Sequence, residues 1–115
     1  MIKAVIFRNT HEYLVGFEIS GHAGYAEIGT DIVCAAVSFL ATTTVNSLEE
    51  QLTVQPIYEV DEADGHLLCY LPAKMDGDDQ EKAQVILKTL EIGLRSIEQD
   101  YVKYVKLLQR RWTKC

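Results

Sequence analysis

The stretch GHAGYAEIGTDIVCAAVSFL, residues 21–40, holds a histidine, an aspartate and a cysteine that together are suited to thiol chemistry. If Asp31 caps a helix over the apolar run that follows, Cys34 is the third helical residue, where backbone N–H groups lack intrahelical partners and the helix dipole is positive. A thiolate is favoured at such a position. His22 follows a β-rich segment, so a sheet packed on this helix would bring its imidazole to the same end, as the base of a cysteine–histidine dyad. The helix N-terminus, or the N–H groups of residues 21–24, would donate to an oxyanion.

The same residues also fit a purely structural interpretation. A cysteine within VCAAV is more often a packing residue, and a lone histidine after a strand is more often structural or exposed. The first expectation for Asp31 is helix capping, because its carboxylate disfavours a nearby thiolate unless it accepts helix N–H bonds or orients His22. Ser38 lies one turn beyond Cys34, where its hydroxyl would bond near the thiol or, as we favour, to the Cys34 carbonyl. Both interpretations stay open on residue types alone.

The elements that must position these residues begin with a hairpin. The run IKAVIF and the alternating run LVGFEIS flank a polar break at residues 9–12. The segment that follows, up to Thr30, contains Gly24 and Gly29 and has no hydrophobic period, which predicts a mobile loop. After Asp31, the run IVCAAVSFLATTTVNSLEEQL is apolar nearly all round over its first two turns, which predicts a central helix covered on most sides.

The second half repeats the hairpin-plus-helix order. The runs IYEV and HLLCYL flank the turn signal DEADG. Asp78 and Glu81 then form a capping-box pattern ahead of a long amphipathic helix of about thirty residues, roughly 45 Å. Its predicted apolar stripe is Ala83, Leu87, Leu90, Leu94, Ile97, Tyr101, Tyr104 and Leu108. The order ββαββα predicts an α+β fold, an antiparallel sheet packed with a central helix and a long C-terminal amphipathic helix, in a single domain over residues 1–115.

Composition excludes several functional classes. The 115 residues carry a formal net charge of −6, which argues against general affinity for nucleic acid or anionic membranes. The start, MIKAVIFRN, has no cleavage-site pattern, and we expect no segment long and apolar enough to cross a bilayer. Three widely spaced cysteines, Cys34, Cys69 and Cys115, do not form a disulfide pattern and suit a reducing cytoplasm.

Other constellations give weaker signals. His66 and Cys69 have a ligand-like spacing, but residues three apart in a strand point to opposite faces, so we expect no metal site. Cys69 is then a core thiol, Cys115 an exposed terminal one and His11 a solvated turn residue. The glycines before the helix suggest an anion cradle, but the nucleotide-binding orders are missing. GHAG also contains the G-x-x-G of KH-type RNA-binding loops, although here a strand precedes it.

The combination of GHA at Gly21–Ala23 with G-x-DIVCAAVS from Gly29 to Ser38 closely resembles the ribosomal-processing cysteine protease family, Prp. The resemblance implies that Cys34 is the nucleophile and His22 its base, with Gly21, Asp31 and Ser38 in support. It implies a cytoplasmic endopeptidase without cofactor or metal that acts as a homodimer. Its substrate would be the N-terminal extension of a large-subunit ribosomal protein precursor, removed after two aromatic residues. No membrane or direct nucleic-acid partner is implied.

The resemblance further implies a loop that orders over the substrate. Its residues here are Ala23, Gly24, Tyr25, Ile28 and Gly29. Tyr25 and Ile28 would line a pocket for the aromatic pair or, on the structural interpretation, anchor the loop to the core. The alternative function is a non-catalytic ribosome-assembly or RNA-binding module in which GHAG grips a backbone and the thiol only packs.

Overall fold

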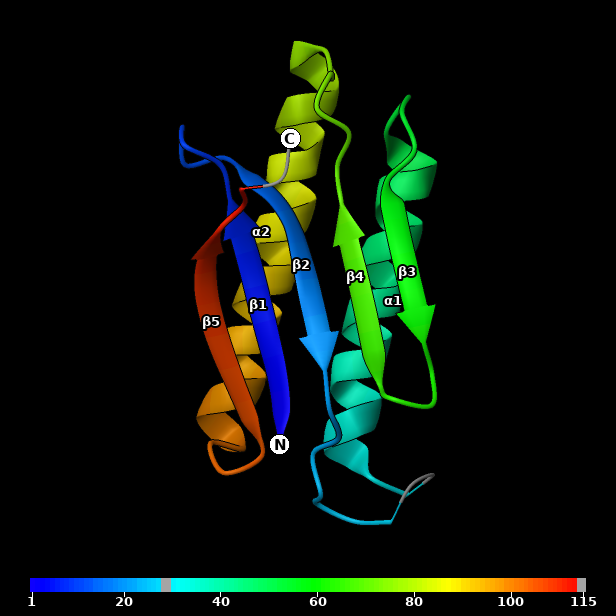
Figure 1. Ribbon diagram of the computed structural model, residues 1–115, viewed down its shortest axis with the longest axis vertical. Helices are drawn as coiled ribbons and strands as arrows, with labels where there is room; N and C mark the ends of the chain where they lie inside the picture. Colours follow the sequence, from blue (N-terminus) through cyan, green and yellow to red (C-terminus); the bar gives the residue numbers. More distant parts are fainter. Residues whose placement is uncertain (28–29, 114–115) are drawn as a thin grey trace.

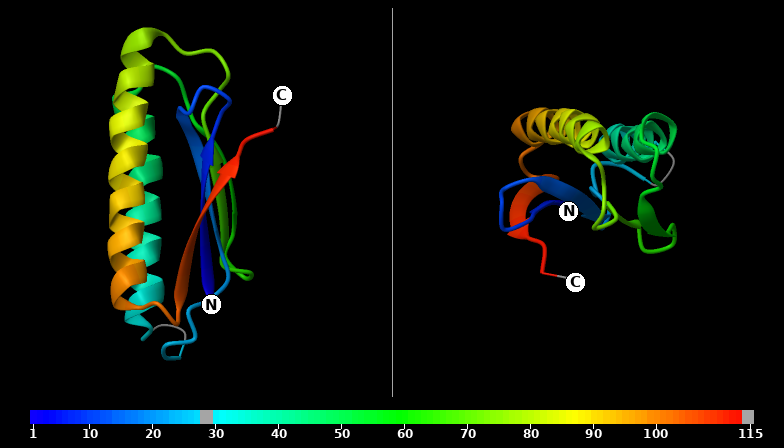
Figure 2. Two further views of the ribbon diagram at one scale, coloured as in Figure 1. Left: turned by 90° about the vertical axis from the view of Figure 1, so that its left-hand side faces the viewer. Right: turned by 90° about the horizontal axis from the view of Figure 1, so that it is seen from above.

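The structure, a computed structural model, describes residues 1–27 and 30–113. Within these ranges the elements are β1 (Ile2–Arg8), β2 (Leu14–Ser20), α1 (Ile32–Gln51), β3 (Ile57–Asp61), β4 (His66–Tyr70), α2 (Gly77–Asp100) and β5 (Val105–Arg111). The strands form one sheet in the order β3-β4-β2-β1-β5, and both helices cover the same face of it (Figure 1, Figure 2). The predicted α+β fold is confirmed.

Both predicted hairpins are present. β1 pairs antiparallel with β2, and β3 pairs antiparallel with β4; β4 joins the two hairpins by pairing with β2. Because side chains alternate along a strand, Ile6 and its partner Phe17 share the face that carries the helices, where both are completely buried. The helices add Val33, Val37, Leu48, Leu87, Leu90 and Leu94 to this core.

The C-terminal segment differs from the prediction. α2 ends at Asp100 with Tyr101 as its C-cap, and the chain turns into β5, which pairs parallel to β1. The sheet is therefore mixed rather than antiparallel, and the order is ββαββαβ. The apolar residues Tyr104 and Leu108 keep the helical spacing of three and four residues, but they lie beyond the end of α2. The segment forms a strand because it pairs with the open edge of β1, which places Val105 beside Ile2 in the core.

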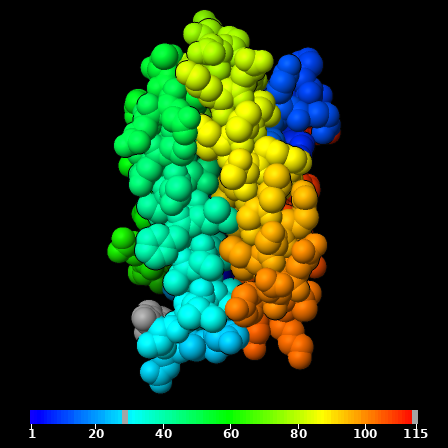
Figure 3. Space-filling model, turned by 180° about the vertical axis from the view of Figure 1, so that it is seen from behind, coloured from blue at the N-terminus to red at the C-terminus, as the bar shows by residue number. Residues whose placement is uncertain are grey.

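The two helices also depart from the sequence-based picture in detail. α2 is capped by Asp76, whose side chain accepts the Asp79 N–H, and not by Asp78. α1 is not covered on most sides: the two helices lie side by side across the back of the sheet, and their outer faces are open to solvent (Figure 3). Phe39, on the outer side of α1, is 75% exposed. Only one side of the apolar first turns of α1 therefore packs against the rest of the protein.

The expectation that no segment is long and apolar enough to cross a bilayer is wrong for α1. Its 20 residues have a mean hydropathy of 1.4 over the most apolar window, so by length and composition it is sufficient to cross a membrane. In the structure this helix packs against the sheet through Val33, Val37, Ala41, Val45 and Leu48. That is the behaviour of a core helix, and it places the start of α1 next to the end of β2.

Candidate active site

Cys34 lies in the first turn of α1, at the third helical position that the sequence predicts. Asp31 is the N-cap, with extended backbone dihedral angles and a side chain that accepts the N–H groups of Val33 and Cys34. The thiol is half-buried, and the Ala23 N–H donates to Cys34 Sγ over 3.2 Å. An N–H dipole aimed at sulfur at the positive end of a helix solvates a thiolate without needing water.

Asp31 does more than begin the helix. Its Oδ1 accepts the N–H groups of Val33 at 2.9 Å and Cys34 at 3.0 Å, and its Oδ2 accepts those of Tyr25 at 3.0 Å and Ala26 at 3.2 Å. Burial of the carboxyl acts to raise its pKa, but these four hydrogen bonds outweigh burial and hold the pKa below its ordinary value. The carboxylate therefore ties the loop after β2 to the start of α1.

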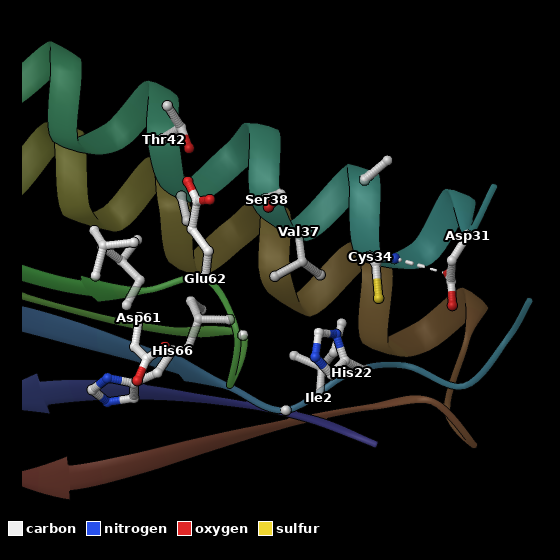
Figure 4. A pocket seen from close by; sticks show the side chains of 17 residues that line it. Ile2, His22, Asp31, Cys34, Val37, Ser38, Thr42, Asp61, Glu62 and His66 are labelled. Carbon is white, nitrogen blue, oxygen red and sulfur yellow. Dashed lines mark hydrogen bonds between the residues drawn. The ribbon is translucent and has the colours of Figure 1, made fainter. Parts of the chain in front are cut away.

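This engagement restricts what Asp31 does for the two reactive side chains. In the part of the chain that the structure describes, no hydrogen bond joins Asp31 to His22, so the capping role is the one observed. The negative charge of Asp31 is occupied by N–H donors, which is the condition under which it can lie near a thiolate. The Cys34 N–H is also occupied, because it donates to Oδ1 (Figure 4).

His22 follows β2 directly, and the backbone there has little freedom. Gly21 has a φ of +86°, and a Cβ on it would lie 2.5 Å from the Met1 carbonyl oxygen. Only glycine fits this close approach. The chain then leaves the sheet, and the His22 side chain lines the same cavity as Cys34 (Figure 4). No hydrogen bond between the imidazole and the thiol is present among the described residues.

The cavity has a volume of about 450 Å³ and runs between α1 and the β3–β4 hairpin. Asp31, Cys34, Val37 and Ser38 line it from the α1 side. Ser38 is exposed, and among the described residues its hydroxyl makes no hydrogen bond to protein, so the favoured bond to the Cys34 carbonyl is not found. The hairpin contributes Val60, Asp61, Glu62, Gly65, His66 and Leu67.

The hairpin side of this cavity was missed by sequence reasoning. DEADG signals a turn, but a turn signal does not say which other loop it faces. The strand order brings β4 next to β2, which sets the turn against His22. The lining then contains three carboxyl side chains, those of Asp31, Asp61 and Glu62, and no lysine or arginine from the described residues.

The predicted substrate loop is only partly described. Ala23 is buried, and nothing lies near the Gly24 Cα that would oppose a side chain. The Tyr25 ring packs edge-to-face on Tyr101 and Tyr104, with centroid distances of 5.6 Å and 5.2 Å. It therefore contacts the connection between α2 and β5. Ile28 and Gly29 lie outside the described residues.

The remaining thiol and histidine candidates lie elsewhere. Cys69 is fully buried, and burial, with a smaller contribution from the charge of Glu49, raises its pKa to about 12. His66 Nε2 lies 2.8 Å from Glu18 Oε2, on the opposite face of β4 from Cys69. Within residues 1–27 and 30–113 no three acidic, histidine or cysteine side chains gather as metal ligands. The exposed His11 lies in the first hairpin turn, and Cys115 lies outside the described residues.

This arrangement has the parts needed for acyl transfer. A thiol lies at a helix N-terminus, an imidazole lines the same cavity, and a backbone N–H is directed at the sulfur. Cys69 is unsuited to this role because its thiol is buried and its pKa favours the neutral form.

Comparison with known proteins agrees with this chemistry. The family described as Cysteine protease Prp matches residues 1–106. The ribosomal processing cysteine protease Prp of Bacillus subtilis is 33% identical over 101 residues, which cover 88% of this chain and 90% of that protein. The crystal structure of an essential ribosomal processing protease Prp from Staphylococcus aureus with a covalently linked product peptide has a TM-score of 0.84 and 28% identity, covering 95% of this chain and 99% of that one. The S. aureus protease with a substrate peptide has a TM-score of 0.79, 28% identity and the same coverage.

Proposed function

The chain belongs to the cysteine protease Prp family and is a cysteine protease; on that premise we propose that it removes the N-terminal extension of a large-subunit ribosomal protein during ribosome maturation, with Cys34 as nucleophile and His22 as base. The names of its relatives as ribosomal processing proteases support the substrate class, and the peptide complexes of the S. aureus protein support a peptide substrate. Family membership favours this function over the non-catalytic RNA-binding module.

The observation that carries the proposal is the position of the Cys34 sulfur. It lies in the first turn of α1, accepts the Ala23 N–H at 3.2 Å and opens into the cavity that His22 also lines. A packing cysteine needs none of these features, and the buried Cys69 has none of them. The same features meet the needs of a nucleophile: an N–H donor directed at the sulfur, a base within one cavity and access for a peptide.

The proposed reaction has two halves. The Cys34 thiolate attacks the scissile carbonyl, a C–S bond forms, and the leaving amine takes a proton from the His22 imidazolium as the C–N bond breaks. Neutral His22 then removes a proton from water, which attacks the thioester; the C–S bond breaks, and the thiolate and the new carboxyl terminus are released. No cofactor is required. The Ala23 N–H, aimed at the sulfur, is placed to donate to the oxyanion that forms beside it, whereas the Cys34 N–H is held by Asp31.

The surroundings of the cavity fit a peptide from a ribosomal protein. Proteins that bind RNA carry basic residues to contact phosphate, so their precursors are attracted to an acidic enzyme. This chain has a net charge of −6, and Asp61 and Glu62 lie at the cavity. In this proposal the protein acts in the cytoplasm as a homodimer, with the loop between His22 and Cys34 closing over the bound extension and Ser38 supporting the site. Free thiols at Cys34 and Cys69 suit that compartment.

The test is the mass of a ribosomal protein precursor before and after incubation with the purified protein. Wild type and Cys69→Ala, a matched change of the buried thiol, should both shorten the precursor at one bond. Cys34→Ala should leave it intact, and His22→Ala should slow cleavage by about two orders of magnitude or more. An intact precursor after incubation with folded wild type, or cleavage by Cys34→Ala, would overturn the proposal.

A further inference from the structure

The turn between β3 and β4 packs against the His22 side chain. Gly65, its last residue, has a φ of +62° and donates its N–H to the Glu62 carbonyl over 3.2 Å. A Cβ on Gly65 would lie 3.0 Å from His22 Cε1 and 3.2 Å from His22 Nε2. It would also lie 2.8 Å from the Gly21 carbonyl oxygen. The edge of the imidazole therefore rests on a part of the turn that has no side chain.

No hydrogen bond holds the His22 ring among the described residues. Among the described residues, no carboxylate or amide hydrogen-bonds to either ring nitrogen. The Asp31 carboxylate, which lines the same cavity, accepts four backbone N–H groups instead. A catalytic imidazole is normally held in orientation by a third group. Where a hydrogen-bonding group is lacking, packing must set the ring position.

The turn is itself fixed to the sheet beneath His22. His66 directly follows Gly65, and its Nε2 lies 2.8 Å from Glu18 Oε2 on β2. β4 pairs with β2 through Leu67 opposite Ile19 and Leu68 opposite Glu18. The strand that leads to His22 is thus the strand that anchors the turn, so the two are held at a constant separation.

We propose that Gly65 is a positioning residue for the reaction: the bare backbone of the β3–β4 turn is the surface that sets the His22 imidazole relative to Cys34. The inference rests on the proposed role of His22 as the base. It adds the orientation of the base to what the second hairpin does, beside lining the cavity. It also explains why glycine stands at a position where an asparagine would satisfy the turn, since asparagine tolerates positive φ but adds a Cβ.

The experiment separates the steric contact from backbone strain. Gly65→Ala adds a Cβ and backbone strain, whereas Gly65→Asn adds the Cβ with much less strain. Ala63→Gly, in the same turn, loosens the backbone without adding an atom and is the matched control. For each protein, kcat and KM for an extension peptide are measured, together with the NMR signal of the His22 Cε1–H group, with His11 as internal reference.

We expect both Gly65 variants to lose at least tenfold in kcat with KM within about twofold, because a displaced catalytic group costs about 10²-fold per ångström. The His22 signal should move in both, the His11 signal in neither, and Ala63→Gly should match wild type. Wild-type kcat in Gly65→Asn, or an unmoved His22 signal in both variants, would overturn the inference. If neither variant folds, Glu18→Ala decides: loss of the hydrogen bond to His66 should shift the His22 signal, and an unchanged signal overturns the inference.

The NMR signal keeps this inference distinct from the proposed function. If wild type cleaves no ribosomal-protein peptide, the function proposed above fails. The position of His22 is still tested, because its resonance reports the contact with residue 65 without any substrate.

Discussion

Selective alkylation of the folded protein tests the assignment of the nucleophile. Cys69 has a pKa of about 12, so at pH 8 about one molecule in ten thousand carries its thiolate, compared with about a quarter for an ordinary thiol of pKa about 8.5. Its side chain is also fully buried. Because only the thiolate reacts, ionisation alone makes Cys69 slower than an accessible thiol by about three orders of magnitude. Cys34, which lines an open cavity, should react at least as fast as an accessible thiol.

The assay is a time course of iodoacetamide labelling, with each site quantified by peptide mass spectrometry. A Cys115→Ser background removes the third thiol from the count. In guanidinium the rates at Cys34 and Cys69 should converge, which shows that the difference belongs to the fold. An extension peptide should protect Cys34 alone. If Cys69 in the folded protein is labelled as fast as Cys34, or if Cys34 is labelled as slowly as Cys69, the structural reasoning for the nucleophile is refuted.

Three further perturbations have defined outcomes. Lowering the pH through the depressed pKa of Asp31 should reduce stability. A carboxyl whose pKa is lowered by folding stabilises the protein above its unfolded pKa of about 3.9, and this stabilisation is lost as the pH falls through the folded pKa. Urea unfolding midpoints measured between pH 7 and 3 should therefore fall less in Asp31→Asn than in wild type. Tyr25→Ala should cost about 1 to 3 kcal/mol of loop anchoring by losing two edge-to-face contacts, seen as faster proteolysis of residues 21–31, and unchanged proteolysis would count against the anchor. Glu91→Ala should lower the free energy of unfolding in urea by about 1–3 kcal/mol, because it removes a buried acceptor from Arg8 and Gln109, whose own side chains still reach water; an unchanged free energy would contradict this.

The parts of the fold that depend on local chemistry were predictable from the sequence. The alternation in LVGFEIS determined which face of β2 is buried, and the capping chemistry of Asp31 determined where α1 begins and hence that Cys34 is the third helical residue. Both signals act within a few residues, so no tertiary information is needed. The position of Cys34 follows directly from that cap.

The parts that depend on pairing between distant segments were not predictable in this way. Spacing alone cannot distinguish a helix from a strand through Tyr104 and Leu108, and the unpaired edge of β1 settled it by placing Val105 next to Ile2. The contact of Gly65 with His22 is of the same kind. DEADG identifies a turn, but only the strand order shows that this turn faces the histidine.

The acidic residue nearest in sequence to each reactive side chain, Glu18 for His22 and Asp31 for Cys34, is engaged with other groups. Asp31 binds four backbone N–H groups, and Glu18 binds His66. Neither is free to orient the imidazole through a hydrogen bond. A base held by packing loses its position when volume is added next to it, because atoms in contact cannot overlap, whereas a base held by a hydrogen bond loses it when an acceptor is removed. For the position of the His22 imidazole, adding a single methyl group at residue 65 is therefore more damaging than removing a carboxylate that does not touch the ring.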